Sequence, residues 1–466
     1  MSPLDSALTN QPLDPSGRKN IAIIGSGITG LSAAWLLNQH HNVSVFEAND
    51  YIGGHSHTVD VEVDGRSVAV DTGFIVYNPQ NYPNLSALFK HLDVPTHATD
   101  MSFAVSLDQQ GYEYSGGDGG GLFAQPTNVF KPRFWSMINS LLRFYRNTDH
   151  YVKLATLENI TLRKLLEKEG YSMAFVRDHL APMGAAIWSS DCEDILDYPA
   201  LSFLKFFQNH GLTQLTDRPQ WRTVVGGSRE YVRRLIEDFN HKIMLNSPVE
   251  KLVKAQHGYA LQSGDTTLQF DEVLFACHSD QTAKILQNSG IKSPQLELLK
   301  NIKYRPNEVI LHSDTRLMPK RKRAWASWNY IERDEAHKKD PAVTYWMNRL
   351  QHIYTATPLL VTLNPQKNNP LDVRDDHILG RYEYDHPVFD LAALKAKKAL
   401  WEQQGFDGLW YGGAWMGDGF HEDGIQAGLA LAELIGGYRR PWNKPDQNAR
   451  IGMADLITLE RMSLAS

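Results

Sequence analysis

Cysteine is nearly absent from this sequence, with only Cys192 and Cys277 among 466 residues. Two cysteines cannot build a disulfide framework, and by themselves they cannot build a thiolate metal site. The sequence therefore predicts a protein of a reducing compartment, and we expect a cytoplasmic location.

The sequence also lacks a long apolar run. Nowhere do about eighteen apolar residues follow one another without a charge, which excludes an ordinary membrane-spanning helix. Residues 1–18 are polar, contain proline and lack the apolar core of a secretory signal, so we expect a disordered lead-in. Any membrane contact is therefore expected to be peripheral, at the inner face of the membrane.

An excess of positive charge is missing as well. The chain has 47 lysine and arginine residues against 53 aspartate and glutamate residues, and its formal net charge is -6. Proteins that wrap nucleic acid need the opposite balance, so no nucleic acid partner is expected. With 42% hydrophobic and 21% charged residues, the composition is that of a folded globular protein, and the length favours two or more lobes.

The first ordered element is a glycine turn between a strand and a helix. Residues 21–24 form a short apolar run, the turn reads GSGITG, and residues 31–37 continue as a helix. Gly25, Gly27 and Gly30 have the dinucleotide-binding spacing, which allows a tight turn, backbone approach to a pyrophosphate and close helix packing. This stretch therefore predicts a strand, a glycine turn and a helix, in that order.

A second strand at residues 43–46 completes the βαβ unit and ends in Glu47. A carboxylate at this point can accept hydrogen bonds from ribose hydroxyls. The N–H groups of Ile28 and Thr29 at the start of the helix face the place of the diphosphate. The pattern predicts an adenine dinucleotide, and an incidental glycine turn is the alternative.

The segment after Glu47 favours FAD over NAD. EANDYIGGHSHTVDVEVDGRSVAVDTGF resembles the extended fingerprint of the flavin-dependent amine oxidase and phytoene desaturase superfamily, in which a second glycine pair precedes residues close to the diphosphate and flavin. His55 stands where that family usually has arginine. A metal pair of His55 and His57 is an alternative that lacks further ligands nearby, so no metal site is predicted. The resemblance implies cofactor contacts by Ala48, Gly53, Gly54, His55, Ser56 and Gly73.

The C-terminal segment LWYGGAWMGDGFHEDGIQAGLALAELI has an apolar strand, a glycine break and a helix that begins near Gly424. In the superfamily such an element closes over the flavin, with the helix N-terminus aimed at the pyrimidine carbonyl region. Ala414 stands where the family usually has glutamate, and an amphipathic helix packed on the sheet is the alternative interpretation. Since neither cysteine is an evident anchor, the FAD is expected to be non-covalent. The resemblance adds Val249, Gly413, Gly424 and Ile425 to the cofactor residues.

Several longer motifs resemble a narrower group. DTGFIVYNPQNYPNL, LAPMGAAIWSS, FFQNHGLTQLTDRPQWRTVVGGSREYV and GDGFHEDGIQAG are similar to the flavoprotein oxidase region of plant cyclopropane fatty acid synthases and to its free-standing bacterial relatives. The similarity runs from Asn20 to about Tyr438. It implies removal of a hydride from a C–H bond, with desaturation of a methyl-branched or cyclopropane fatty acyl chain of a phospholipid.

Two alternatives to this desaturase stay open. One is a flavin amine oxidase that acts on a small amine. The other is a non-catalytic flavoprotein partner of a lipid methyltransferase. The expected partners are thus a lipid or acyl-chain substrate, a membrane surface and a lipid methyltransferase.

The candidate catalytic residues are polar groups in the shared motifs. His421, Glu422 and Asp423 precede the C-terminal helix, where acidic residues also serve as helix caps. His210 is a candidate base or a structural histidine at a helix end, and Tyr77 is a polar group in an otherwise apolar turn. Trp188, Trp221, Trp346 and Trp415 are core aromatics or the lining of a long apolar cavity.

The predicted fold class is α/β, with a discontinuous Rossmann-like FAD-binding lobe and an α+β substrate lobe in an amine oxidase-like two-domain arrangement. The pattern predicts a helix around residues 134–145, strands at 244–253, 259–263 and 271–277, and an antiparallel sheet within 301–365. The predicted segments are the lead-in (1–18), the FAD-binding lobe (19–80, 221–290 and 401–440), the substrate lobe (81–220, mostly helical, and 291–400) and a C-terminal tail (441–466).

Two basic stretches carry contact with anionic lipid as an alternative interpretation. The run PKRKR ends at Arg323, and Trp325 and Trp328 follow it. Residues 131–146 mix basic and aromatic side chains as an interfacial helix does. A basic run of this kind is usually a solvated loop, and packing on the substrate lobe explains the apolar face of the helix equally well.

Overall fold

The computed structural model describes residues 17–107, 111–116, 119–188, 190–216, 218–333, 342–365, 372–445 and 447–452. The predicted lead-in lies outside the described residues except for its last two positions. Part of the glycine cluster at 115–121 and the end of the C-terminal tail also lie outside them.

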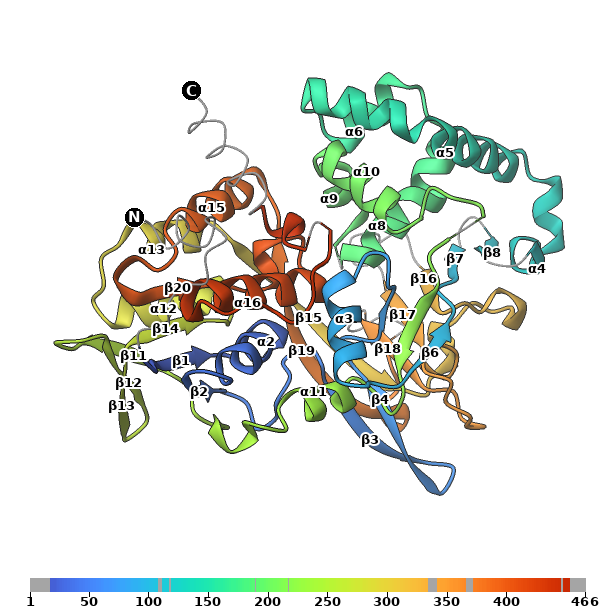
Figure 1. Cartoon of the computed structure of the whole chain (residues 1–466). Helices are drawn as coiled ribbons and strands as arrows, with labels where there is room; N and C mark the ends of the chain where they lie inside the picture. Colours follow the sequence, from blue (N-terminus) through green and yellow to red (C-terminus); the bar gives the residue numbers. More distant parts are fainter. Residues whose placement is uncertain are drawn as a thin grey trace.

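A parallel sheet of five strands forms the centre of the first lobe, with the strand order β10-β2-β1-β14-β20 (Figure 1). Three distant segments of the chain supply these strands, as expected for a discontinuous nucleotide-binding lobe. The strands are β1 (Asn20–Ile24), β2 (Asn42–Phe46), β10 (Ile243–Met244), β14 (Glu272–Phe275) and β20 (Leu409–Tyr411).

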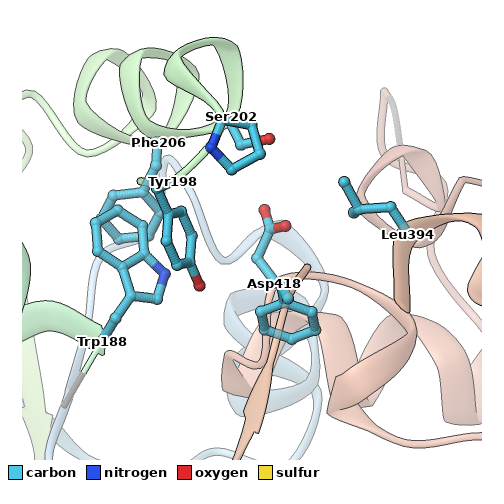
Figure 2. A pocket seen from close by; sticks show the side chains of 8 residues that line it. Trp188, Tyr198, Ser202, Phe206, Leu394 and Asp418 are labelled. Atoms are coloured by element: carbon cyan, nitrogen blue, oxygen red, sulfur yellow. The ribbon is translucent and has the colours of Figure 1, made fainter. Parts of the chain in front are cut away.

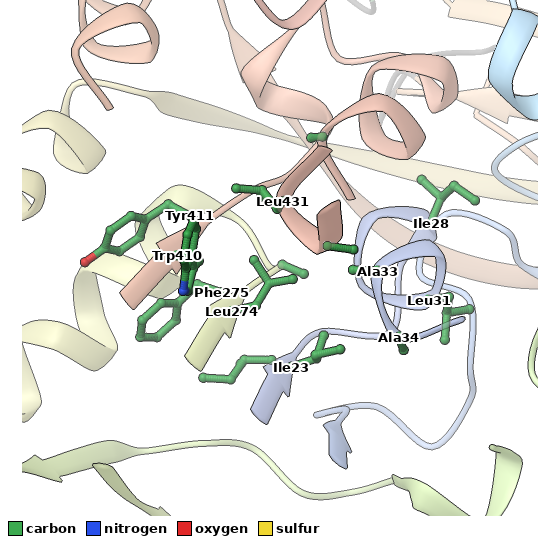
Figure 3. Close-up of a cluster of buried hydrophobic side chains, with 14 of the residues drawn as sticks. Ile23, Ile28, Leu31, Ala33, Ala34, Leu274, Phe275, Trp410, Tyr411 and Leu431 are labelled. Atoms are coloured by element: carbon green, nitrogen blue, oxygen red, sulfur yellow. The ribbon is translucent and has the colours of Figure 1, made fainter. Parts of the chain in front are cut away.

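Burial on both faces explains why β1 is continuously apolar, since residues 21–24 are at most 5% exposed. Helix α2 is buried along its whole length and packs against α16 over the sheet. Small residues permit this approach: a Cβ at Gly428 would lie 2.3 Å from the carbonyl oxygen of Thr29. Figure 3 shows Ile23, Leu274 and Leu431 in the resulting core.

Helices and short helical turns surround the parallel sheet, and α13 and α15 belong to the same apolar cluster as its strands. They are α2 (Ile28–Leu37), α3 (Pro83–His91), α11 (Arg229–Leu235), η3 (Asn240–Lys242), α12 (Ser279–Asn288), α13 (Pro294–Lys300), α15 (Leu391–Trp401), η8 (Phe406–Gly408), η9 (Ala414–Met416), α16 (His421–Gly436) and η10 (Ala449–Ile451).

The second lobe has its own apolar cluster and a seven-stranded sheet with the order β19-β15-β18-β17-β16-β7-β8. The antiparallel sheet predicted within residues 301–365 is confirmed, since the pairs β15·β18, β18·β17 and β17·β16 are all antiparallel. Strand β7 comes from a distant segment outside that range and adds to this sheet in parallel with β16. The strands are β7 (Phe103–Leu107), β8 (Tyr112–Gly116), β15 (Lys303–His312), β16 (Trp328–Glu332), β17 (Ala342–Trp346), β18 (Leu360–Leu363) and β19 (Ile378–Val388).

The long helix α5 confirms the helix predicted at 134–145 and extends it in both directions. Pro132 occupies its first turn, and Asn159 in the left-handed conformation (φ 48°) ends it. Figure 1 shows α5, α6, α8, α9 and α10 gathered beyond the sheet. The helices and helical turns of this lobe are α4 (Gly119–Leu122), η1 (Pro126–Phe130), α5 (Pro132–Glu158), α6 (Leu162–Lys168), α7 (Met173–Phe175), the π-turn η2 (Val176–Leu180), α8 (Ala181–Trp188), α9 (Cys192–Leu196), α10 (Ala200–Asn209), η4 (Thr315–Leu317), η5 (Lys322–Ala324), α14 (Met347–Leu350) and η7 (Asp375–His377).

Three small sheets complete the fold. The strand predicted at 244–253 is in fact two strands, because a loop with Asn246 in the left-handed region (φ 49°) separates them. The small sheets contain β3 (Thr58–Val63) with β4 (Arg66–Asp71), β5 (Val76–Tyr77) with β9 (Trp221–Val224) and β6 (Thr96–Thr99), and β11 (Lys251–Lys254) with β12 (Tyr259–Ser263) and β13 (Thr266–Phe270).

Within the described ranges, no helix is both long enough and apolar enough to cross a bilayer.

Candidate functional site

The glycine turn after β1 leaves one position open to a ligand. A Cβ at Gly25 would lie 2.9 Å from the Ala276 carbonyl oxygen, and one at Gly30 would lie 1.9 Å from that of Gly25. A Cβ at Gly27 would have no atom within 4 Å. Close backbone packing therefore requires glycine at positions 25 and 30. At Gly27 the protein itself leaves room for a side chain. That space can receive a diphosphate at the end of the parallel strands.

The start of α2 suits an anion. Gly27 is the N-cap residue, no side chain caps the helix there, and the first turn contains no acidic residue. The backbone N–H groups at the start of a helix have no partner within the helix, and the helix dipole favours a negative charge. Ile28, Thr29 and Gly30 thus meet the requirements for binding a diphosphate.

Glu47 follows β2 directly and is only 6% exposed. Its Oε2 atom accepts hydrogen bonds from the N–H (2.9 Å) and hydroxyl (2.6 Å) of Ser26, and Oε1 accepts one from the N–H of Asn49 (2.9 Å). The carboxylate is thus fixed against the glycine turn. It can hold two ribose hydroxyls while it orients Ser26.

We expect Glu47→Ala to lower the affinity for FAD by about 10- to 100-fold, on the order of 1 to 3 kcal/mol, because ribose hydroxyls and Ser26 would lose their acceptor. Flavin fluorescence during dilution measures the loss. Glu47→Gln keeps one acceptor oxygen and should lose less. Equal flavin retention by Glu47→Ala and the wild type after extensive dialysis would contradict the assignment.

The second glycine pair lies against the first turn. A Cβ at Gly54 would be 3.1 Å from the Cα atom of Gly27, and Gly53 and Gly54 both have positive φ angles (126° and 58°). A Cβ at Gly73 would lie 2.2 Å from the carbonyl oxygen of His55. The fold therefore brings Gly53, Gly54, His55 and Gly73 together beside the open space at Gly27.

Three histidines from different elements meet near this loop. The ring of His55 is 6.4 Å from that of His278, which follows β14, and 5.7 Å from that of His386 in β19. His55 Nε2 and His278 Nδ1 are buried and have no hydrogen-bond partner. A buried polar atom without a partner is rare, and a bound ligand would satisfy both ring atoms. These residues therefore fit a polar cofactor at this position.

Burial lowers the pKa of all three imidazoles, to about 4 for His55 and His278 and to about 3 for His386. The folded chain keeps them neutral, whereas unfolded histidines take up protons below 6.5. A lowered pKa in the folded state supplies stability that is present above pH 6.5 and is lost as the pH falls toward 4. Burial raises the pKa of Asp71 to about 6, so its contribution to stability has the opposite pH dependence and falls as the pH rises from about 4 to about 6.

We therefore expect His386→Gln to reduce the pH dependence of the free energy of unfolding of the apoprotein between about pH 3 and about pH 6.5. Urea unfolding at several pH values measures it. The exposed His97 offers a control, and His97→Gln should follow the wild-type curve. Parallel curves for His386→Gln and the wild type would show that this imidazole does not resist protonation.

The C-terminal element closes on the glycine turn from the other side. The hydroxyl of Thr29 donates a hydrogen bond to the carbonyl oxygen of Gly424 (2.9 Å), and a Cβ at Gly424 would lie 2.6 Å from the Ile28 side chain. Ile425 is fully buried. Gly413 follows β20, and a Cβ there would meet the Trp415 ring at 2.2 Å. The starts of α2 and α16 thus lie beside each other.

His421, the first residue of α16, forms a polar network with two side chains. Its Nε2 atom is 2.7 Å from the hydroxyl of Tyr231 and 3.3 Å from that of Ser56, and these two hydroxyls are also hydrogen-bonded. Phe74 stacks on the imidazole with ring centroids 3.9 Å apart. Burial lowers the pKa of His421 to about 3 and raises that of Tyr231. The network is neutral and can hold or pass a proton at Nε2.

Glu422 and Asp423 point to other partners. The Glu422 carboxylate accepts hydrogen bonds from the N–H groups of Asn84 and Leu85 at the start of α3 and from the side chains of Asn84 and Gln426. Asp423 accepts hydrogen bonds from the N–H groups of Asp418 and Phe420. Both carboxylates are buried, and the Oδ1 atom of Asp423 forms an ion pair with the Arg450 guanidinium (2.6 Å), so both are engaged in positioning the loop before α16. Of the three predicted residues, only His421 joins the network with Tyr231.

The rings of Phe89 and Tyr231 separate Tyr77 from His421. Its ring packs on Phe89 at 5.1 Å, and Phe89 packs on Tyr231 at the same distance. The Tyr77 hydroxyl donates a weak hydrogen bond to Thr96 (3.4 Å). The structure thus places Tyr77 behind the network, toward a surface groove, rather than beside His421.

His210 belongs to an aromatic stack that leads to the loop before α16. Its Nδ1 atom donates to the carbonyl oxygen of Phe206 (2.9 Å), so Nε2 carries a lone pair, and that atom is buried without a partner. The ring stacks on Phe206 at 3.9 Å and lies near Trp221 and Phe420. Burial lowers the pKa of His210 to about 3. His210 is thus a neutral acceptor among aromatic rings.

A small pocket opens between the lobes next to this stack (Figure 2). Apolar side chains dominate its wall, and Asp418 is its one charged residue. Trp188 lines the pocket, but Trp346 packs against Trp325 instead, and Trp415 donates a hydrogen bond to the Cys277 carbonyl oxygen. The lining residues are Trp188, Tyr198, Pro199, Ser202, Phe206, Phe389, Leu394 and Asp418.

The remaining predicted residues lie at the margin of the site. Ala48 is exposed directly after Glu47, and Val249 is buried in the loop after β10. Burial raises the pKa of Cys277 to about 11 and that of Cys192 to about 12, so both thiols stay protonated and are poor nucleophiles. This chemistry agrees with the expected non-covalent FAD.

Sequence reasoning missed Phe74, Tyr231, Phe420, His278 and His386. Their only signal in the sequence is proximity to shared motifs, since each reaches the site through a contact between distant segments. For Phe420 the nearest hint was its place directly before His421 in the motif GFHEDG.

Known proteins resemble this chain over most of its length. The flavin-containing amine oxidoreductase family matches residues 28–386. Bovine (Bos taurus) flavin-containing amine oxidase A is 25% identical over 305 residues, which are 61% of this chain and 54% of that protein. The chain thus spans about half the length of the curated relatives it matches.

Solved structures show the same fold. A redesigned putrescine oxidase has a TM-score of 0.64 at 15% identity, with 90% of this chain and 98% of that chain covered. Cyclohexylamine oxidase from Brevibacterium oxydans IH-35A has 0.63 at 16%, covering 90% and 99%. A fatty acid isomerase from P. acnes that produces CLA has 0.62 at 14%, covering 91% and 99%.

The open space at Gly27, the uncapped start of α2, Glu47 and the unpartnered imidazoles all fit FAD, and the match covers far more than half of the chain. The chain belongs to the flavin-containing amine oxidoreductase family, whose members are FAD-dependent oxidoreductases.

Proposed function

We propose that this protein is an FAD-dependent oxidoreductase that removes a hydride from a C–H bond of a fatty acyl chain and leaves a double bond. Bound FAD would supply the hydride acceptor. The observation that carries the proposal is the neutral, aromatic surrounding of His421. Phe74, Tyr231 and Phe420 lie at this position, and the neighbouring carboxylates of Glu422 and Asp423 are engaged elsewhere.

Aromatic and apolar walls suit an acyl chain. Burial of each methylene contributes about 0.8 kcal/mol, so an acyl chain needs no charged anchor. The interlobe pocket, with a cavity volume of about 20 Å³, supplies only a short stretch of such a wall, with Trp188, Tyr198 and Phe206, beside the loop that precedes His421. The same fold carries a fatty acid isomerase in P. acnes, so it accommodates a fatty acid in that protein.

The polar network supplies the place for the second hydrogen. His421 is neutral because burial lowers its pKa to about 3, and its Nε2 atom is linked to the hydroxyls of Tyr231 and Ser56. Because the low pKa disfavours a lasting imidazolium, a proton accepted at Nε2 would have to pass on through the two hydroxyls to solvent. Phe74 holds the imidazole plane by stacking, and the His421 side chain is half-buried at this position.

Oxidation of a small amine is the second candidate, and the similarity to bovine amine oxidase A favours it. In that case Asp418 in the interlobe pocket would bind the ammonium group beside Trp188 and Tyr198, as carboxylates and aromatic rings do together. The two candidates thus differ in the role of one carboxylate.

The test is anaerobic bleaching of the flavin absorbance by candidate substrates. A phospholipid with a methyl-branched or cyclopropane acyl chain should bleach the wild type, and shorter acyl chains should bleach it progressively more slowly. Asp418→Asn should then change little, and His421→Asn should slow bleaching strongly while FAD stays bound. Fast bleaching by monoamines or polyamines that Asp418→Asn abolishes would establish the amine oxidase instead. No bleaching by either class would indicate a flavoprotein partner without turnover, such as a scaffold for a lipid methyltransferase.

A further inference from the structure

Exposed apolar side chains gather at one place on the substrate lobe. Of the twelve large hydrophobic side chains that are exposed among the described residues, four lie within thirteen consecutive positions. They are Phe123 (38% exposed), Val129 (41%), Phe130 (86%) and Trp135 (42%).

The fold holds these side chains outward on an ordered segment. The Trp135 Nε1 atom donates a hydrogen bond to the Val129 carbonyl oxygen (2.8 Å). Phe123 and Trp135 both contact the buried ring of Phe134, at 6.1 and 5.6 Å. Phe130 ends the turn η1 just before α5. Its exposure is therefore a property of the folded lobe.

A basic loop is fixed beside this segment. Glu113 in β8 accepts hydrogen bonds from the backbone N–H groups of Lys320 (2.7 Å) and Arg321 (3.2 Å) and pairs with the Arg321 side chain (3.0 Å). The turn η5 that follows packs against α4 and β8. Lys320, Arg321, Lys322 and Arg323 are all exposed. We call the four exposed hydrophobic residues and Lys320–Arg323 the aromatic-basic patch.

The patch has one sign of charge although the whole chain carries -6. Residues 119–148 contain four basic and no acidic residues, and residues 315–331 contain five basic and no acidic residues. The nearby carboxylates of Glu113 and Asp178 are buried and pair with Arg321 and Arg133. Within these two described stretches, the exposed charges around Phe130 are therefore positive.

We propose that the aromatic-basic patch docks on an anionic lipid bilayer. Phe130 and Trp135 enter the headgroup region, where aromatic side chains are favoured, and Lys320–Arg323 lie against the lipid phosphates. Charge complementarity favours lipid, because exposed aromatic side chains beside four exposed basic residues match an anionic interface. The proposal does not depend on which substrate the flavin site oxidises.

Sedimentation of the FAD-loaded full chain with lipid vesicles tests the proposal. We expect binding to vesicles that contain about one third phosphatidylglycerol, little binding to pure phosphatidylcholine, and loss of binding as salt rises to about 0.5 M. Lys322→Ala and Arg323→Ala should each weaken binding about five-fold, and Phe130→Ser about ten-fold.

Matched controls lie on the same lobe. Leu157 is 84% exposed at the far end of α5, and Lys153 is exposed on the same helix, so Leu157→Ser and Lys153→Ala should bind as the wild type does. Equal binding to neutral vesicles, no binding to either kind, or equal losses in the controls would overturn the proposal. Dimers in sedimentation equilibrium that Phe130→Ser dissociates, without vesicle binding, would assign the patch to a second copy of this chain instead.

Discussion

Gly27→Val is expected to give a folded protein without flavin. The backbone of Gly27 has φ -70°, a conformation open to any residue, and its added Cβ would meet no protein atom within 4 Å. The valine side chain would therefore enter the space that the diphosphate needs and disturb nothing else. We expect FAD affinity to fall at least about a hundred-fold, roughly 2.7 kcal/mol or more.

The ratio of flavin absorbance to protein absorbance measures this loss, and circular dichroism confirms the fold. Gly116→Val is a matched control, because a Cβ at Gly116 has only the Phe103 carbonyl oxygen as a neighbour, at 4.0 Å, in the other lobe. It should keep its flavin. A normal flavin spectrum in Gly27→Val would place the cofactor elsewhere.

Glu422→Ala is expected to destabilise the protein strongly. Glu422 is fully buried, and four donors from Asn84, Leu85 and Gln426 would lose their acceptor. Unpaired buried donors of this kind cost about 3 to 5 kcal/mol together. Thermal unfolding should therefore shift down by about 3 to 5 °C, since the entropy of unfolding of a chain of 466 residues is large. Glu422→Gln should also destabilise, since an amide N–H₂ would face the donors of α3.

The experiment separates a positioning role from a reacting role for Glu422. At temperatures well below unfolding, folded Glu422→Gln should keep its flavin and much of its reduction rate, whereas His421→Asn should keep stability and lose rate. Glu402 is exposed at the end of α15, and Glu402→Ala should leave both quantities unchanged. A stable Glu422→Ala that has lost only its rate would make this carboxylate a reacting group.

The nucleotide-binding unit could be read from the sequence because each of its requirements is local. A buried strand, three glycines, a helix and Glu47 occupy fewer than thirty consecutive residues, and neighbouring segments fix their conformation. The amine oxidase-like two-lobed fold followed from the same region together with the C-terminal motif, and the family match confirms it.

The network around His421 could not be read in this way. Tyr231 lies 190 positions from His421, and Ser56 lies 365 positions away, so no local pattern joins them. The parallel pairing of β16 with β7 was missed for the same reason, since alternating residues reveal a strand but not its neighbour. His421 joins this network and Glu422 bonds to α3 instead, because adjacent residues of a helix point in different directions.

The division of the parallel sheet among three chain segments also governs the order in which the protein can form during synthesis. The last strand of the seven-stranded sheet ends at Val388, before β20 and α16 have been made. The substrate lobe is therefore completely synthesised first. Until β20 has been made, the parallel sheet of the cofactor lobe is incomplete and β14 is its unpaired edge strand. Flavin capture must wait for Leu409–Gly436, so a nascent chain stalled before this stretch would be colourless and prone to aggregate through that edge.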